Sequence, residues 1–201
     1  MTVNPILTIG HSNHSWEAFA DLLNQHRVDT LADVRSVPAS RFNPQFNRSS
    51  LSASLHDVGI GYVFRGGELG GRPQDSACYE NGRVRYDRMA KTATFRRGLA
   101  LVKADAAHHR VVLVCAEKDP LDCHRTLLVA RALATDGVDV LHVLWDGIVE
   151  THDQAMDRLL ASYDLETEGD LFTSRDELIA QAIERQTQRV GYVDDKRQQR
   201  G

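Results

Sequence analysis

The chain of 201 residues is long enough for one domain with a sizeable core, or for one domain with an appendage. Its formal net charge of −4 gives no global reason to expect nucleic acid or an anionic membrane as a partner, although a local basic surface is compatible with it. No signal peptide, membrane-spanning run or disulfide framework is recognisable, so we expect a cytoplasmic protein with reduced thiols and no membrane contact.

Short apolar runs alternate with segments of helical periodicity along the first 150 residues. In chain order, the apolar runs predict strands at 6–9, 29–34, 61–64, 111–115 and 138–144. The segments between them predict helices at 16–26, 51–59, 86–106 and 126–137. Strands that alternate with helices form a parallel sheet covered on both sides. We therefore expect an α/β fold with a mostly parallel five-stranded sheet and helices on both faces.

The pattern changes after Trp145. Two helices are predicted at 152–163 and 174–190, and Ser174 with Glu177 forms a capping-box pair at the start of the second. The chain thus divides into an α/β domain at 1–149 and a helical extension at 150–201. Two interpretations of the extension stay open: it packs on the domain, or it meets a partner.

Reactive side chains gather in the stretch CAEKDPLDCHR, which begins at Cys115. In an open parallel sheet, ligands bind beyond the carboxyl ends of the strands, and Cys115 and Glu117 fall at such an end. On its own, Cys115 is more typical of a small buried hydrophobic residue than of a reactive thiol. The stretch is therefore compatible with a thiolate, an anion site or a metal site.

The second part of this stretch has the pattern of a helix start. Asp119 followed by Pro120 is typical of an N-cap and a first helical residue, which places Cys123, His124 and Arg125 in the first turn and a half. Unpaired amides at a helix N-terminus favour anions and lower the pKa of a thiol. The alternative for His124 and Arg125 is a solvated helix face.

Two further strand ends carry similar groups. The first strand runs into His11 and Ser12, and the second runs into Asp33, Arg35 and Ser36. Because the strands are expected to be parallel, these side chains should converge with those of the stretch CAEKDPLDCHR at one edge of the sheet. Their coincidence at three strand ends favours a functional site there.

The loop RSVPASRFNPQFNR, which contains Arg41, has three arginines, two phenylalanines and no acid. Arginine forks suit phosphate oxygens, and aromatic faces suit bases. The alternative is a proline-stiffened surface loop whose Phe42 and Phe46 tuck into the core. A second loop, rich in glycine and containing Arg72, has the composition of a flexible lid.

The motifs TIGHSN, LADVRSVPASRFNPQFN, GIGY, LGGR and CAEKDPLDCHR occur in that order. Together they resemble the bacterial and archaeal family known as domain of unknown function 488, over about residues 5 to 145. The resemblance implies an α/β fold with one motif-rich edge, and it implies no activity. The matching positions are Gly10, His11, Ser12, Asp33, Arg35, Ser36, Pro38, Arg41, Gly70, Gly71, Cys115, Glu117, Pro120, Cys123, His124 and Arg125.

The first hypothesis is an enzyme that acts on a phosphorylated small molecule or nucleic acid. The expected catalytic set is Cys123, Cys115, His11, His124, Asp33 and Glu117, with a cysteine as nucleophile and a histidine as acid or base. The expected substrate-binding set is Arg35, Ser36, Arg41, Arg72, Arg125 and Ser12. Cysteine phosphatases and sulfurtransferases also have a cysteine-to-arginine loop at a strand-to-helix turn. Their spacing is shorter than that from Cys115 to Arg125, which argues against direct membership of those families.

Two other hypotheses stay open. One is a zinc or iron site, with Cys115, Cys123, His11 and His124 as candidate ligands. The other is a non-catalytic module that binds nucleic acid or an anionic ligand. The sequence indicates no particular cofactor, substrate or oligomeric state.

Overall fold

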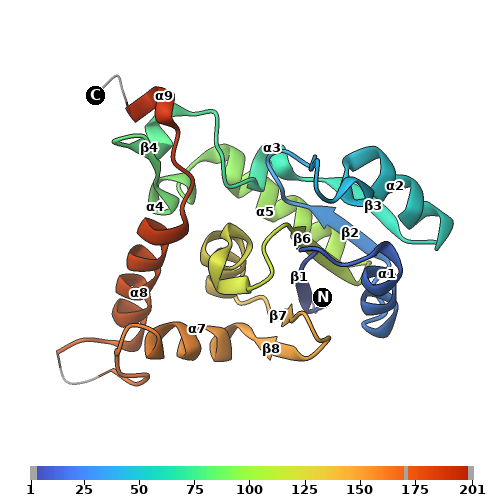
Figure 1. The fold of residues 1–201 in the computed structure, drawn as a ribbon. Coiled ribbons are helices and arrows are strands. Elements are labelled where there is room, and N and C mark those ends of the chain that lie inside the picture. The colour runs from blue at the N-terminus through green and yellow to red at the C-terminus, as the bar shows by residue number, and fades with distance from the viewer. Residues whose placement is uncertain (1–3, 170–171, 199–201) are drawn as a thin grey trace.

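The computed structural model describes residues 4–169 and 172–198. A six-stranded sheet forms its centre, in the spatial order β3-β2-β6-β1-β7-β8 (Figure 1). Its strands are β1 (Ile6–Gly10), β2 (Thr30–Asp33), β3 (Gly61–Phe64), β6 (Val111–Cys115), β7 (Val140–Val143) and β8 (Val149–Thr151). The first five of these pair in parallel, as expected, whereas β8 pairs antiparallel with β7.

The expected five strands are all present, but the sheet is mixed and has a sixth strand. The sequence of β8 is Val-Glu-Thr, which is short and partly polar, so no apolar run marks it. A separate two-stranded hairpin, β4 (Tyr79–Glu80) with β5 (Arg83–Val84), was also not expected. Each of its strands has two residues, which is too short to show the alternation of apolar and polar residues that predicts a strand.

The central strands β1, β2 and β6 are buried on both faces of the sheet, and alternate residues of one strand contact the two faces. Val112 and Val114 of β6 pack with the buried residues of α1 (Trp16–Gln25) and α2 (Arg48–Asp57). Val111, Leu113 and Cys115 pack with the other core cluster, which includes α5 (Ala93–Ala106). Burial on both faces explains why β6 is apolar throughout.

The remaining helices are mostly short. They are α3 (Gly66–Leu69), α4 (Tyr86–Met89), α6 (Arg131–Thr135), α7 (His152–Ala161), α8 (Arg175–Val190) and α9 (Asp195–Gln198). The single helix expected at 86–106 is two helices, because the Thr92 hydroxyl accepts a hydrogen bond from the Phe95 amide and starts α5 afresh. In the described ranges, no helix is long and apolar enough to cross a membrane.

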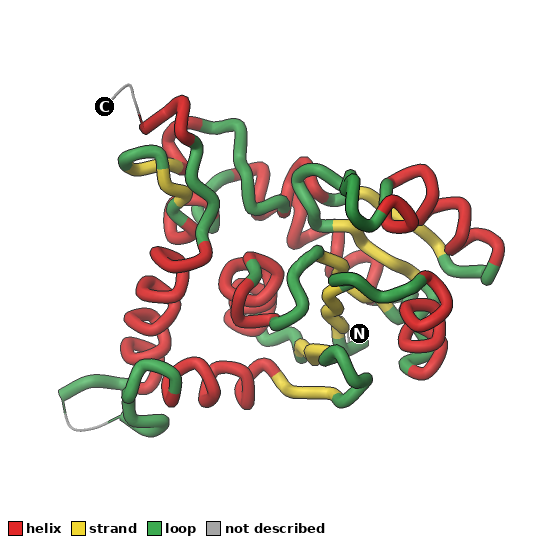
Figure 2. Tube along the Cα trace, in the orientation of Figure 1, coloured by secondary structure: helices red, strands yellow, loops and turns green. Residues whose placement is uncertain are grey.

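The C-terminal extension shares the core of the α/β part. Met156 and Leu159 of α7 and Ile183 of α8 belong to the same buried cluster as β6 and α5. From the end of α7, α8 runs to the β4–β5 hairpin, and its two ends thus join distant parts of the fold (Figures 1 and 2). Both α7 and α8 begin with capping boxes, and the one at α8 is the expected pair Ser174 and Glu177.

A pair of histidines links β7 to the start of α7. His142 Nδ1 lies 2.7 Å from Thr8 Oγ1, and His142 Nε2 lies 3.1 Å from His152 Nδ1. Burial, followed by the nearby His152, holds the pKa of His142 well below its usual value. Burial, followed by the charge of Arg131, lowers the pKa of His152 to about 4.

We predict that this pair makes the protein less stable in acid. The unfolded chain takes up these protons near pH 6.5, whereas in the folded chain His152 takes up its proton only near pH 4 and the pKa of His142 lies well below its usual value. The free energy of unfolding therefore falls as the pH drops below about 6.5. Each histidine contributes a slope of at most about 1.4 kcal/mol per pH unit. Urea titrations of His152→Asn should show a shallower slope than wild type. His56→Gln, at a position with a 90 % exposed side chain, should leave the slope unchanged. An equal slope in wild type and His152→Asn would contradict the prediction.

Candidate active site

The carboxyl ends of three adjacent strands meet at one edge of the sheet. In the β1–β6 ladder Gly10 is opposite Cys115, and in the β2–β6 ladder Asp33 is opposite Val114. The chain continues past these ends with the motifs that contain His11, Arg35 and Glu117. Parallel pairing in this register therefore brings the three motifs to one place.

Two sulfurs and one imidazole nitrogen form a compact cluster at this edge. His124 Nδ1 lies 3.7 Å from Cys115 Sγ and 3.7 Å from Cys123 Sγ. The three atoms all lie within 4.8 Å of one another, and within the described residues this is the one group with the spacing of a metal site. Cys115 and Cys123 are buried, with exposed fractions of 5 % and 2 %.

Neighbouring groups hold the His124 ring in this orientation. His124 Nε2 lies 3.0 Å from the Val34 carbonyl, which can only accept, so Nε2 carries a proton and Nδ1 faces the sulfurs. Gly71 packs against the ring, since a Cβ at Gly71 would lie 2.9 Å from His124 Cγ and 3.0 Å from Nδ1. A hydrogen bond and a close backbone contact thus fix both the tautomer and the position of the ring.

The expected helical placement of Cys123 is wrong. Residues Pro120–Asp122 form a 3₁₀ turn, and Cys123 that follows has an extended backbone with φ −139° and ψ 141°. The helix begins after it, as a π-helical segment Arg125–Ala130 that continues into α6. Cys123 instead caps this helix: its carbonyl accepts from the amides of Thr126 and Leu127, and its Sγ accepts from the Arg125 amide at 3.4 Å.

The surroundings of the two thiols shift their pKa values in opposite directions. Burial opposes ionisation of Cys123, but a hydrogen bond from Cys115 and the charge of Arg125 outweigh it and hold the pKa of the Cys123 thiol well below its usual value. The hydrogen bond to Cys123, followed by burial, raises the pKa of the Cys115 thiol. Burial likewise opposes protonation of His124, but the neighbouring Cys123 raises its pKa.

Asp33, Arg35 and His11 form a buried network beside the cluster. Arg35 Nε and Nη2 donate to the two carboxylate oxygens of Asp33 at 2.9 and 2.6 Å, and the Tyr62 hydroxyl donates to Asp33 Oδ2 at 2.9 Å. Arg35 Nη1 donates to His11 Nε2 at 3.0 Å, while His11 Nδ1 donates to the Ser12 carbonyl. Burial, followed by the charge of Arg35, lowers the pKa of His11 to about 4. His11 is therefore neutral near pH 7 and acts as an acceptor for Arg35.

Arg125 is fully buried and binds the backbone. Its Nη1 donates to the Glu117 carbonyl at 2.7 Å, and its Nη2 lies 3.2 Å from the Lys118 carbonyl. Gly10 allows this packing, because a Cβ there would lie 1.8 Å from the Glu117 oxygen. The Arg125 guanidinium thus shapes the loop after β6, and it does not line the pocket described next.

A pocket of about 250 Å³ opens beside the cluster. The expected site residues in its wall are Arg35, Ser36, Arg72, Cys115, Glu117, Cys123 and His124. Those outside the wall are His11, Ser12, Asp33, Arg41 and Arg125. Of the two loop phenylalanines, Phe46 is buried as the structural alternative expected, whereas Phe42 is exposed.

The extension closes one side of this pocket, which the sequence did not reveal. Val190 and Tyr192 line the wall together with Tyr86, and the guanidinium of Arg72 lies 4.6 Å from the Tyr192 ring centre. No local pattern links Tyr192 to residues that precede it by a hundred positions or more. Only the packing of α8 against the rest of the fold brings them together.

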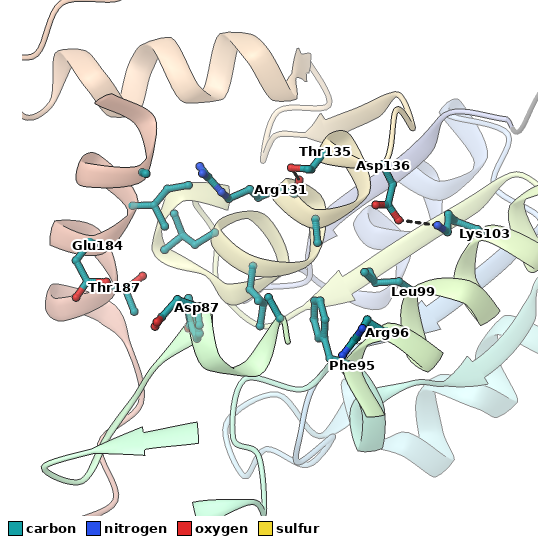
Figure 3. A pocket seen from close by; sticks show the side chains of 17 residues that line it. Asp87, Phe95, Arg96, Leu99, Lys103, Arg131, Thr135, Asp136, Glu184 and Thr187 are labelled. Atoms are coloured by element: carbon teal, nitrogen blue, oxygen red, sulfur yellow. Dashed lines mark hydrogen bonds and ion pairs between the residues drawn. The ribbon is translucent and has the colours of Figure 1, made fainter. Parts of the chain in front are cut away.

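A larger cavity of about 590 Å³ lies between α5, α6 and α8 (Figure 3). Its walls are largely apolar, with Phe95 and Leu99 on one side and the ion pair of Lys103 with Asp136 at the rim. Neither cysteine of the cluster nor His124 lines it. The smaller pocket is therefore the candidate active site, because the reactive groups are there.

We predict that Arg125→Met destabilises the fold. A buried carbonyl without a partner costs about 1–3 kcal/mol, so loss of both bonds should lower the free energy of unfolding by about 2–6 kcal/mol. The matched variant is Arg72→Met, at an exposed arginine in the pocket wall, which should change stability by less than about 1 kcal/mol. Urea denaturation measures both. Equal stability of the two variants would contradict a structural role for Arg125.

Comparison with known proteins gave one match. The family model described as "Domain of unknown function DUF488" matches residues 15–132. The matched span includes β2, β6 and the whole stretch from Cys115 to Arg125. No curated protein and no solved structure matches the chain.

Proposed function

Because the chain belongs to the DUF488 family, whose description names no activity, we propose a function from the geometry of its site. We propose an enzyme whose Cys115, Cys123 and His124 bind a zinc or iron ion and whose adjacent pocket binds a phosphorylated small molecule or nucleic acid. The reaction class that fits best is metal-assisted hydrolysis of a phosphate ester.

The position of His124 Nδ1 relative to the two sulfurs carries this proposal. In a tetrahedral zinc site, bonds of about 2.3 Å to sulfur and 2.0–2.1 Å to nitrogen place sulfur and nitrogen about 3.6 Å apart. Both sulfur–nitrogen distances here are 3.7 Å. Metal-binding histidines also donate their other ring N–H to a carbonyl or carboxylate, as His124 does to Val34.

Three protein ligands and an open side are typical of a catalytic metal site and not of a structural one. The pocket supplies this open side, and Ser36, Arg72 and Glu117 share its wall. Arg72 suits a phosphate oxygen. Glu117, whose pKa is raised by burial, is the candidate base for an attacking water.

We predict that the purified protein binds one zinc or iron ion per chain. Cys115→Ser, Cys123→Ser and His124→Asn should each reduce the bound metal by at least tenfold, because each removes a ligand. Cys78→Ser is the matched control, since Cys78 is also buried and lies outside the cluster. Elemental analysis after dialysis measures the metal. A wild-type protein with no more metal than Cys123→Ser would contradict the proposal.

We predict that Gly71→Ala also weakens metal binding. The added methyl group would push against His124 Cγ and Nδ1 and so displace a ligand that the substitution leaves chemically intact. The matched control is Gly67→Ala, since a Cβ at Gly67 meets nothing within 4 Å. Cobalt titration followed by the thiolate-to-cobalt absorption band measures affinity in both variants. Equal affinities would show that the His124 ring is not a ligand.

A metal-free thiolate enzyme is the second candidate. The Arg125 amide, which donates to Cys123 Sγ at 3.4 Å, and the adjacent imidazole both favour a nucleophilic thiolate at Cys123. On this mechanism, iodoacetamide should label Cys123 before Cys115 in a chelator-treated protein, and phosphate should slow the labelling. Activity that survives complete metal removal would favour this second candidate over the first.

A further inference from the structure

One segment next to the pocket has a charge opposite to that of the chain. Residues 34–56 contain three arginines and no Asp or Glu, although the whole chain has 28 acids and a net charge of −4. Arg35 is buried and paired with Asp33, so the positive charge at the surface comes from the exposed Arg41 and Arg48. Ser36 and Val37, at the start of this segment, line the pocket. The surface that leads away from the pocket along this segment is therefore locally basic and suits an anionic partner.

Phe42 stands exposed in the middle of this segment. Its side chain is 90 % exposed, which is unusual for a large aromatic residue. Val37, which lines the pocket, is 60 % exposed. Exposed apolar side chains in a basic surface indicate a partner that combines negative charge with flat apolar faces.

The turn that carries Phe42 is tied down. Ser40 Oγ accepts from the amides of Phe42 and Asn43 at 3.2 and 3.1 Å, and Asn47 Oδ1 accepts from the Ser40 amide at 2.6 Å. Phe46, which follows in the same turn, is fully buried and stacks on His11 with ring centres 4.3 Å apart. The exposure of Phe42 is thus a property of an ordered turn, and little conformational entropy would be lost when a partner binds it.

We propose that this surface binds single-stranded nucleic acid, with a base stacked on Phe42 and backbone phosphates held by Arg41 and Arg48. Every base has an apolar face that stacks on an aromatic ring, and arginine forks suit phosphates. Phe42 follows Val37 by five residues, a span of at most about 17 Å, so a strand of a few nucleotides bridges the two. This inference rests on the proposed function in one respect, namely that the strand leads a phosphate into the pocket.

Fluorescence anisotropy with a labelled oligothymidine of about 12 nucleotides tests the inference. Phe42→Ala should weaken binding by about 5- to 150-fold, the range for loss of one stacked base, and Phe42→Trp should retain it. Phe172→Ala is the matched control, because Phe172 is 92 % exposed and lies in the C-terminal extension. It should bind as wild type does.

The salt dependence of binding tests the role of the arginines. Arg41→Met should reduce the slope of log affinity against log salt by about 0.7, the value for one phosphate contact to a single strand. Arg97→Met, at an exposed arginine of α5, should leave the slope unchanged. A slope that Arg41→Met and Arg97→Met change equally would overturn the assignment of phosphate contacts to this segment.

Three results would overturn the inference: no binding of the strand by the wild type, equal binding by wild type and Phe42→Ala, or equal affinity for single strand and duplex. A wild-type dimer that Phe42→Ala dissociates, without strand binding, would identify the surface as a contact between copies. Cys123→Ser separates this inference from the proposed function. This variant should lose the metal and still bind the oligothymidine. A wild-type protein that binds the oligothymidine but no metal would contradict the proposed function and leave this inference intact.

Discussion

The hydrogen bond from His124 Nε2 to the Val34 carbonyl determines which nitrogen of His124 faces the two cysteines. Because the carbonyl can only accept, the bond leaves Nδ1 as the nitrogen that faces Cys115 and Cys123. Val34 follows β2, the cysteines flank the loop after β6, and Gly71, which packs on the ring, comes from a third motif. Three separate segments of the chain thus position the His124 imidazole.

Hydrogen bonds to the loop after β6 help to hold the two cysteines in place. Arg125 holds the carbonyls of Glu117 and Lys118, and Gly10 leaves room for that loop. The extension reaches the same loop from the other side, since Gln186 of α8 donates to the Leu121 carbonyl at 2.9 Å. A loop held on both sides keeps two sulfurs close together although eight positions separate them in the chain.

The fold and the cysteine–histidine cluster were predictable to different degrees. Apolar runs marked the five parallel strands, and their parallel order placed Cys115 at the correct edge. The role of Arg125 was not predictable, because a guanidinium suits a carbonyl as well as an anion and only packing decides between them. Tyr192 and β8 were missed for another reason: their positions depend on tertiary contacts and leave no periodic pattern.

Some of the expected site residues are already engaged in hydrogen bonds with one another. Arg35, which the sequence placed among the reactive groups, binds Asp33 and His11, and His11 also donates to the Ser12 carbonyl, so most of the hydrogen-bonding capacity of both side chains is already used. The other polar groups in the pocket wall are Arg72, Ser36, Glu117, Asp122, the hydroxyl-bearing Tyr86 and Tyr192, and the cluster itself. The proposed function assigns Arg72 to the anion and the cluster to the metal ion.

X-ray absorption spectroscopy of the zinc-loaded protein is the most direct test of the proposed metal site. The geometry predicts a first shell with two sulfurs at about 2.3 Å and a nitrogen at about 2.0–2.1 Å, with the remaining position filled by a light atom. A first shell of oxygen and nitrogen alone would contradict the account, because it would place the metal away from Cys115 and Cys123.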